Sequence, residues 1–132
     1  MLGVSDPRNS PPSRPYSPAV VTSGFVYLSG HVPVDERGLT IGLTGAEQTE
    51  RVLTNLTYTL HSAGCTLADV VSTTVFLTDI SLIDEVDKVY RSFFEGDPYP
   101  ARTTIEVSAL ARTDFLVEIS AIANIPKVGT TK

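Results

Sequence analysis

Two charged side chains on apolar segments near the C-terminus could together carry out acid–base chemistry on an anion. Glu118 is the only charge in the apolar segment 115–123, and Arg102 lies near the start of the preceding segment, 100–107. A carboxylate at a buried strand position needs a partner, a shifted pKa or a function. The polar turn at 112–114 predicts that the two segments pair as a hairpin. This pairing would place an anion-binding guanidinium beside a carboxylate that can move a proton.

A second pair of chemically capable residues, His61 and Cys65, stands four positions apart near the end of a predicted helix. Two ligands without a third make a poor metal site, and the helix is expected to stop at Gly64. We therefore expect no metal at this pair.

The first half of the chain is predicted to form a hairpin and a helix. Residues 1–13 hold three prolines among polar residues and are expected to form a flexible arm. Two apolar segments, 19–22 and 25–31, flank Ser23-Gly24, which is a two-residue turn signal. Residues 44–47 have the spacing of a capping box, and apolar residues then recur at helical intervals as far as Gly64.

The second half supplies a strand at 70–77, a helix from about Ser81 to Gly96, and the two strands that carry Arg102 and Glu118. The resulting order, β-β-α-β-α-β-β, predicts one α+β domain over residues 14–132, with both helices on one face of a mixed sheet. The strands are too apolar for the other face to contact only water. We therefore expect an oligomer that buries this second face.

Composition excludes several classes of protein. The 132 residues carry a net charge of −5, and the ten basic residues are scattered, which argues against a nucleic-acid surface. The single cysteine, Cys65, excludes an internal disulfide and fits a reducing compartment. No signal peptide and no apolar run of membrane-spanning length is present, so we expect a cytoplasmic protein without membrane contact.

Short motifs spread over about residues 14–123 point to one family. They are Arg14-Pro15-Tyr16-Ser17, residues 26–33, residues 47–56, residues 71–77, Pro100-Ala101-Arg102 and Val117-Glu118-Ile119. In these motifs the chain resembles the Rid family, also called YjgF/YER057c/UK114, which consists of small enamine and imine deaminases. The resemblance implies a chorismate-mutase-like fold, a homotrimer, and three sites in clefts between subunits.

The resemblance further implies hydrolysis of reactive 2-imino acids, or their 2-enamino tautomers, to 2-keto acids and ammonia. Such intermediates are released by pyridoxal-phosphate-dependent dehydratases, which would be functional partners, and no cofactor is expected. In this reaction Arg102 would hold the substrate carboxylate bidentately, because guanidinium and carboxylate are both planar. Glu118 would accept a proton from the attacking water and could return it to the leaving nitrogen.

Four other residues match substrate-binding positions of the family. Tyr16 would supply a ring wall and a hydroxyl, and the backbone at Ser29 and Gly30 would line the cleft. A glycine in a strand lets a ligand approach the main chain closely. Thr104 stands where some members have cysteine, and its backbone amide would support the carboxylate.

The chain departs from the family pattern at several positions. Arg14 replaces a glycine, Pro18 and His31 replace glutamines, Asp87 replaces an asparagine, and the turn at 111–114 differs in composition. His31 and Asp87 are therefore possible modulators of the site, with His31 able to titrate near neutral pH. Asp87 would add negative charge near a site for anions.

Several alternatives remain open at the level of sequence. Arg102 could form a structural ion pair with Glu106 or Glu118, and Glu118 could face solvent. The protein could be a non-catalytic trimer that binds a small carboxylate and regulates a partner, or a deaminase with a narrower, pathway-specific substrate. The least favoured alternative is an RNA-acting translation inhibitor, because the net charge opposes it.

Overall fold

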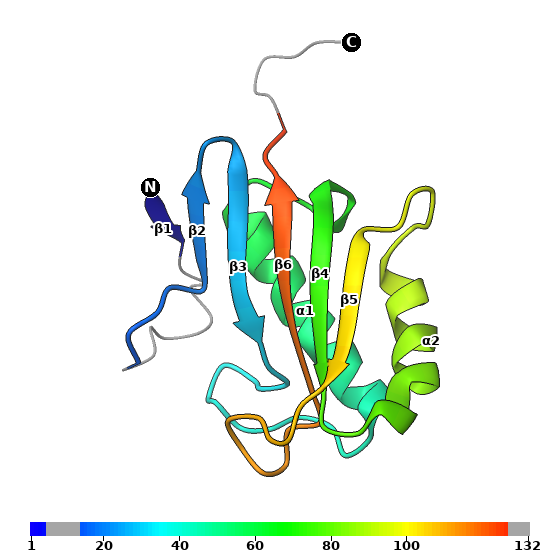
Figure 1. The fold of residues 1–132 in the computed structure, drawn as a ribbon. Helices are drawn as coiled ribbons and strands as arrows, with labels where there is room; N and C mark the ends of the chain where they lie inside the picture. The colour runs from blue at the N-terminus through cyan, green and yellow to red at the C-terminus, as the bar shows by residue number, and fades with distance from the viewer. Residues whose placement is uncertain (5–13, 127–132) are drawn as a thin grey trace.

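A six-stranded sheet carries two helices on one of its faces (Figure 1). The computed structural model describes residues 1–4 and 14–126. Short 3-10 turns at Leu67–Asp69 and Ile80–Leu82 precede β4 and α2. The elements in chain order are β1 (Leu2–Val4), β2 (Ala19–Thr22), β3 (Phe25–His31), α1 (Gly45–Ser62), β4 (Val70–Leu77), α2 (Ile83–Phe93), β5 (Ala101–Glu106) and β6 (Val117–Asn124).

The strand order is β1-β2-β3-β6-β4-β5, and only β4 and β5 are parallel. The predicted hairpin between the strands of Arg102 and Glu118 is therefore wrong, because β4 lies between β5 and β6. The helix α2 connects β4 to β5 as a crossover, which sets the two strands parallel and side by side. The chain then passes the lower ends of the strands in Figure 1 and returns as β6 on the other side of β4.

The early hairpin is confirmed. β2 and β3 pair antiparallel around Ser23 and Gly24, whose φ angles of 52° and 83° suit a tight two-residue hairpin turn. The segment predicted as an arm contains one strand, because Leu2–Val4 pairs with β2 and forms the edge of the sheet. Residues 5–13, the rest of that segment, lie outside the described residues.

Helix α1 begins at the predicted capping box. The Thr44 hydroxyl accepts a hydrogen bond from Glu47 N, and Glu47 Oε1 accepts one from Thr44 N, so two amides of the first turn are satisfied. The helix ends just before Gly64, whose φ of 81° favours glycine. Its apolar side, which includes the buried Leu53 and Leu56, packs on the sheet and forms the core.

A buried amide on α1 fixes the segment that leads into β6. The Gln48 amide nitrogen donates to Asp114 O at 2.8 Å, and its Oε1 atom accepts from Leu116 N at 2.7 Å. Gln48 is 1% exposed, so these bonds form away from water and hold the start of β6 in place.

Helix α2 is shorter than predicted. It begins at Ile83 and ends at Phe93, because Phe94 already has an extended backbone and packs its ring 4.5 Å from that of Tyr90. Val86 and Tyr90 are the buried residues of this helix. The Tyr90 hydroxyl and the Thr73 hydroxyl on β4 are 2.8 Å apart, so this bond ties α2 to the sheet.

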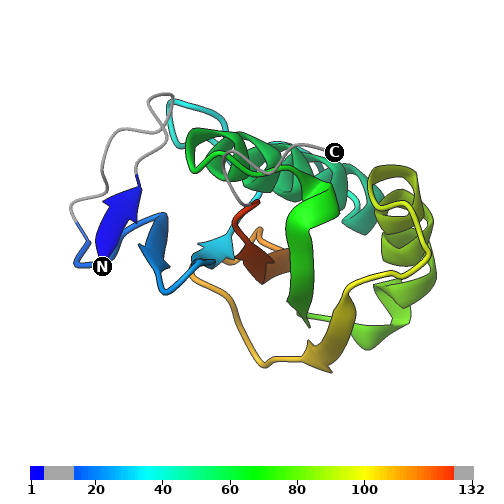
Figure 2. The ribbon, with the colours of Figure 1, turned by 90° about the horizontal axis from the view of Figure 1, so that it is seen from above.

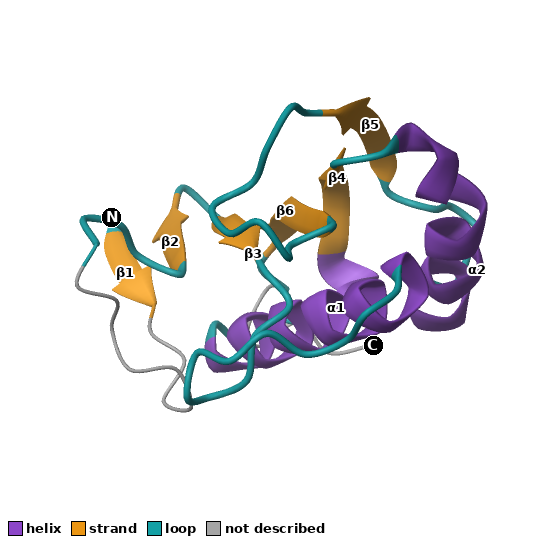
Figure 3. Ribbon diagram, turned by 90° about the horizontal axis from the view of Figure 1, so that it is seen from below, coloured by secondary structure: helices purple, strands orange, loops and turns teal. Residues whose placement is uncertain are grey.

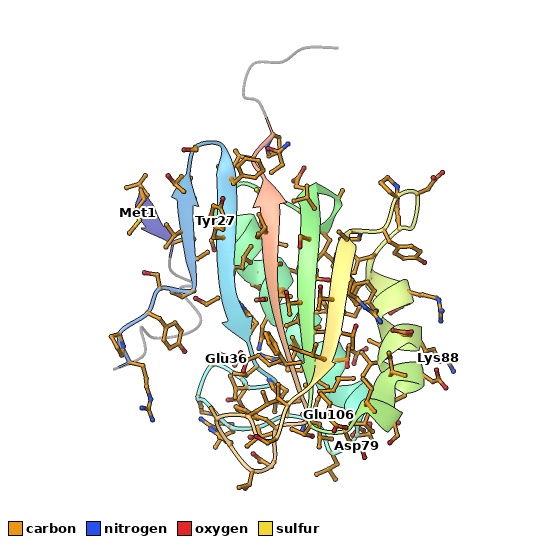
Figure 4. All side chains as sticks on the ribbon, viewed as in Figure 1. Met1, Tyr27, Glu36, Asp79, Lys88 and Glu106 are labelled. Atoms are coloured by element: carbon orange, nitrogen blue, oxygen red, sulfur yellow. The ribbon has the colours of Figure 1, made fainter. Side chains whose placement is uncertain are left out.

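Both helices cover the same face of the sheet, and we call the opposite face the open face (Figures 2 and 3). Side chains alternate between the faces along a strand. Tyr27, labelled in Figure 4, alternates with the buried Val26 and Leu28 and lies on the open face with Phe25 and Ile105. These three apolar side chains are each more than one third exposed, so the open face carries exposed apolar surface, as the sequence predicted.

Neither described helix combines the length and the apolar character that crossing a lipid bilayer requires.

Candidate functional site

A cleft at the lower end of β3 brings together five of the predicted site residues. Its volume is about 720 Å³, and the segment before β2, the end of β3, the loop after it and β6 form its walls. We call it the Glu118 cleft. The predicted site residues that line it are Tyr16, Ser29, Gly30, His31 and Glu118.

Gly30 leaves the space that the Glu118 carboxylate occupies. A Cβ atom at position 30 would overlap Glu118 Oε2, so no larger residue fits while Glu118 keeps this position. The pairing of β3 with β6 shifts register between Leu28 and His31, so Gly30 lies in an irregular part of the strand. Burial raises the pKa of Glu118 above its ordinary value. The carboxylate is therefore a stronger base than one in open water.

His31 and Ser29 hold the irregular end of β3. His31 is 8% exposed; its Nδ1 atom donates to Ser29 O at 2.7 Å, and its Nε2 atom lies 2.8 Å from the Thr59 hydroxyl on α1. The Ser29 hydroxyl donates to Ser17 O, and Ser29 N donates to Pro18 O. The Ser29 bonds fix the segment that carries Tyr16 against β3, and the contact of His31 with Thr59 ties the end of β3 to α1.

The sequence did not predict the part of the cleft lining that comes from the loop after β3 and from the turn before β6. Asn55 on α1 donates to Val32 O and Val34 O, both at 2.9 Å, and the Arg112 guanidinium donates to Gly38 O. An asparagine on the apolar side of a helix indicates that its side chain holds a neighbouring segment, because a buried amide requires hydrogen-bond partners. Nothing in the sequence around Arg112 indicated that its side chain would hold the loop after β3.

Arg102 lies elsewhere, on β5 against helix α2. Its Nη2 atom is 2.7 Å from Asp87 Oδ1, its Nε atom donates to the Thr104 hydroxyl at 2.8 Å, and its guanidinium carbon is 4.9 Å from the centre of the Tyr90 ring. We call these four residues the Arg102 cluster. The alternative that Arg102 forms an ion pair with Glu106 or Glu118 is therefore wrong, because its partner is Asp87. Glu106 instead accepts a hydrogen bond from Ile80 N.

The two groups lie on opposite faces of the sheet. Arg102 is the register partner of Thr73 on β4, and Thr73 faces the helices and forms a hydrogen bond with Tyr90. Glu118 is the register partner of Phe76, three positions further along β4. Because side chains alternate between faces, Glu118 points to the open face. One chain holds the two halves of the predicted site, but it does not join them.

Cys65 is 2% exposed, and burial raises the pKa of its thiol, whereas His61 is exposed. In the described ranges 1–4 and 14–126, no three His, Cys, Asp or Glu residues are grouped to hold a metal ion.

The arrangement can do two things chemically. The Glu118 cleft offers a desolvated carboxylate that can accept a proton, and the Arg102 cluster offers a fixed guanidinium that can bind an anion. Fold and site thus define an α+β protein with a polar site divided between the two faces of its sheet.

Comparisons with known proteins show the family of the chain. A family model described as Endoribonuclease L-PSP matches residues 7–125. A RutC family protein of Pyrococcus abyssi is 40% identical over 113 residues, which are 85% of this chain and 87% of that protein. The chain therefore belongs to the Rid/YjgF/RutC family, which confirms the resemblance of its motifs.

Solved structures of two relatives have the same fold. The Rid family protein YyfA of Yersinia pestis superposes with a TM-score of 0.85 at 38% identity, covering 93% of this chain and 98% of that chain. TdcF of E. coli, solved with bound serine, superposes with a TM-score of 0.87 at 28% identity, covering 96% and 100%.

Proposed function

We propose that this protein hydrolyses reactive 2-imino acids and their 2-enamino tautomers to 2-keto acids and ammonia, as a homotrimer. In each site, Arg102 of one subunit completes the Glu118 cleft of its neighbour. The observation that carries the proposal is the division of the site. A base and an anion-binding group, each well formed, lie on opposite faces of one chain, and the exposed apolar residues of the open face supply a surface for a second chain.

The reaction follows from the chemistry of the two halves. Arg102 binds the substrate carboxylate and fixes the C=N carbon near Glu118. Glu118 takes a proton from water as the water oxygen bonds to that carbon, and the nitrogen leaves as ammonia after receiving a proton. The raised pKa of Glu118 suits both steps, because it brings the group closer to the working pH. General acid–base catalysis of this kind accelerates a reaction by about 10²–10⁴-fold.

Two findings on relatives support the substrate class. The family includes enamine and imine deaminases, and the relative TdcF binds serine, a small molecule with a carboxylate and a nitrogen on the adjacent carbon. The 720 Å³ cleft has room for a small acid of this kind.

The test couples the purified protein to a serine or threonine dehydratase and follows the decay of the released imine. The wild-type protein should accelerate the decay, whereas Arg102→Ala and Glu118→Ala should both remove the acceleration and keep the trimer. Arg91→Ala, which changes an exposed arginine on α2, is the matched control and should keep full activity. A fully active Arg102→Ala variant would refute the assignment, and light scattering that gives a monomer would refute the shared site.

A trimer that binds a small carboxylate without turnover is the second candidate. The ion pair between Asp87 and Arg102 favours it, because the guanidinium already has a negative partner. Thermal stabilisation by small acids, together with unchanged imine decay, would support this alternative.

The name of the family model, Endoribonuclease L-PSP, motivates a third candidate, which is RNA cleavage. The net charge of −5 opposes it, since a phosphate backbone is held mainly by basic side chains. RNA cleavage that co-purifies with the wild-type protein and disappears in Arg102→Ala would establish this activity.

A further inference from the structure

The Arg102 cluster has balanced charge. Asp87 Oδ1 lies 2.7 Å from Arg102 Nη2, and the two side chains are 26% and 21% exposed, respectively. The guanidinium and the carboxylate therefore reach solvent side by side at the same place. A ligand that binds Arg102 meets a positive and a negative charge together.

The cluster has hydrogen-bonding groups of both kinds. Arg102 donates its Nε–H to the Thr104 hydroxyl, and among the described residues no partner is found for its Nη1 atom, which can donate to a ligand oxygen. The Asp87 Oδ1 atom is buried and pairs with Arg102 Nη2, whereas the Asp87 side chain as a whole is 26% exposed. The cluster thus offers guanidinium donors for a carboxylate and a carboxylate for a nitrogen that carries hydrogen.

We propose that Asp87 is a specificity residue that makes the Arg102 cluster select ligands with a cationic nitrogen next to the carboxylate over simple carboxylate anions. This inference rests on the proposed function, because it takes the Arg102 cluster as the place where the substrate carboxylate binds. The ligand class is the zwitterionic 2-iminium acid, in which the carboxylate faces Arg102 and the N–H group faces Asp87.

The same selection favours release of the product. A 2-iminium acid has no net charge, whereas the 2-keto acid product is an anion with no donor on the adjacent carbon. Asp87 attracts the first and repels the second, since like charges a few ångströms apart in a partly desolvated site disfavour binding. The product therefore leaves more readily than the substrate.

The test measures binding with two stable probes that share one carbon skeleton, 2-aminobutanoate and 2-oxobutanoate. Calorimetry on the wild-type protein at neutral pH should give a lower Kd for the amino acid. In Asp87→Asn, which keeps shape and removes the charge, the ratio of the two Kd values should shift by about tenfold or more toward the keto acid. Asp84→Asn removes the same charge from an exposed residue of the same helix and should leave the ratio unchanged.

An equal ratio in wild type and Asp87→Asn overturns the inference, as does an equal shift in Asp84→Asn, which would indicate a long-range charge effect. Failure of both acids to bind the wild-type protein at millimolar concentration also overturns it. Glu118→Gln separates this result from the proposed function. A changed ratio together with full imine hydrolysis in Glu118→Gln would keep the role of Asp87 and reject Glu118 as the base.

Discussion

The Arg102 cluster and the Glu118 cleft solve opposite electrostatic problems. Arg102 has an ion pair, a hydrogen bond and an aromatic ring, which fix its position at the edge of the sheet. Glu118 is half-buried, and within the described residues only burial shifts its pKa. A group that binds an anion works best when its direction is fixed in advance, whereas a base works best when no partner competes for its proton. In the proposed reaction these two requirements are met on different faces of one sheet.

The sharpest test of this division mixes two inactive variants. Arg102→Ala and Glu118→Ala should each lower activity by about 10²–10⁴-fold. Co-expressed in equal amounts, they should recover about a quarter of wild-type activity, because each site would take one residue from each of two neighbouring subunits. The measurement is imine decay on the purified mixed trimers. Arg102→Ala mixed with the double variant should recover nothing, and a mixture of the single variants that stays inactive would contradict a shared site.

Gly30→Ala should damage the cleft and leave the Arg102 cluster intact. The new Cβ atom overlaps the Glu118 carboxylate, so we expect kcat to fall about 100-fold as the base is displaced. The same overlap should lower the melting temperature. In the Glu118→Ala background the overlap is gone, so Gly30→Ala should then leave the melting temperature nearly unchanged. An equal decrease in both backgrounds would show that the backbone, and not the carboxylate, requires glycine.

The pH dependence should report the desolvation of Glu118. Because its pKa is raised, the group takes up a proton at a higher pH than an ordinary glutamate, and kcat/KM should decrease as pH falls through that value. Since the folded state binds the proton more tightly than the unfolded state, the same protonation stabilises the fold. Urea unfolding should therefore find Glu118→Gln more stable than wild type at neutral pH, with a difference that shrinks in acid. If the difference in the free energy of unfolding did not change with pH, Glu118 would have the same pKa in the folded and unfolded states, which contradicts desolvation.

The smallest effect should come from Thr104→Val, which removes the hydrogen bond that orients Arg102. We expect KM to rise about three- to tenfold with little change in kcat, because one hydrogen bond contributes about 0.5–1.5 kcal/mol. Steady-state kinetics provide the measurement. The neighbouring Thr103 points to the other face, so Thr103→Val is the matched control. A fall in kcat alone for Thr104→Val would give Thr104 a role beyond holding Arg102.

Local signals in the sequence were sufficient for most of the elements. The hairpin at Ser23-Gly24 and the capping box at Thr44 were predicted within a residue or two, because neighbouring residues decide both structures. The end of α2 was misplaced at Gly96, because Phe94 leaves the helix to pack against Tyr90. A glycine signals where a helix can stop, whereas tertiary packing decides where it does stop.

The candidate residues of the site and the exposed apolar side chains of the second face could be named from the order of amino acids alone. The path of the strands could not, since adjacent segments pair as a hairpin or separate around a third strand according to which buries more apolar surface. Insertion of β4 between β5 and β6 moved Arg102 to Asp87 and left Glu118 on the open face. Which charges meet in this protein is therefore a property of long-range strand order, because electrostatic contacts depend on distances in space and not on spacing in the chain.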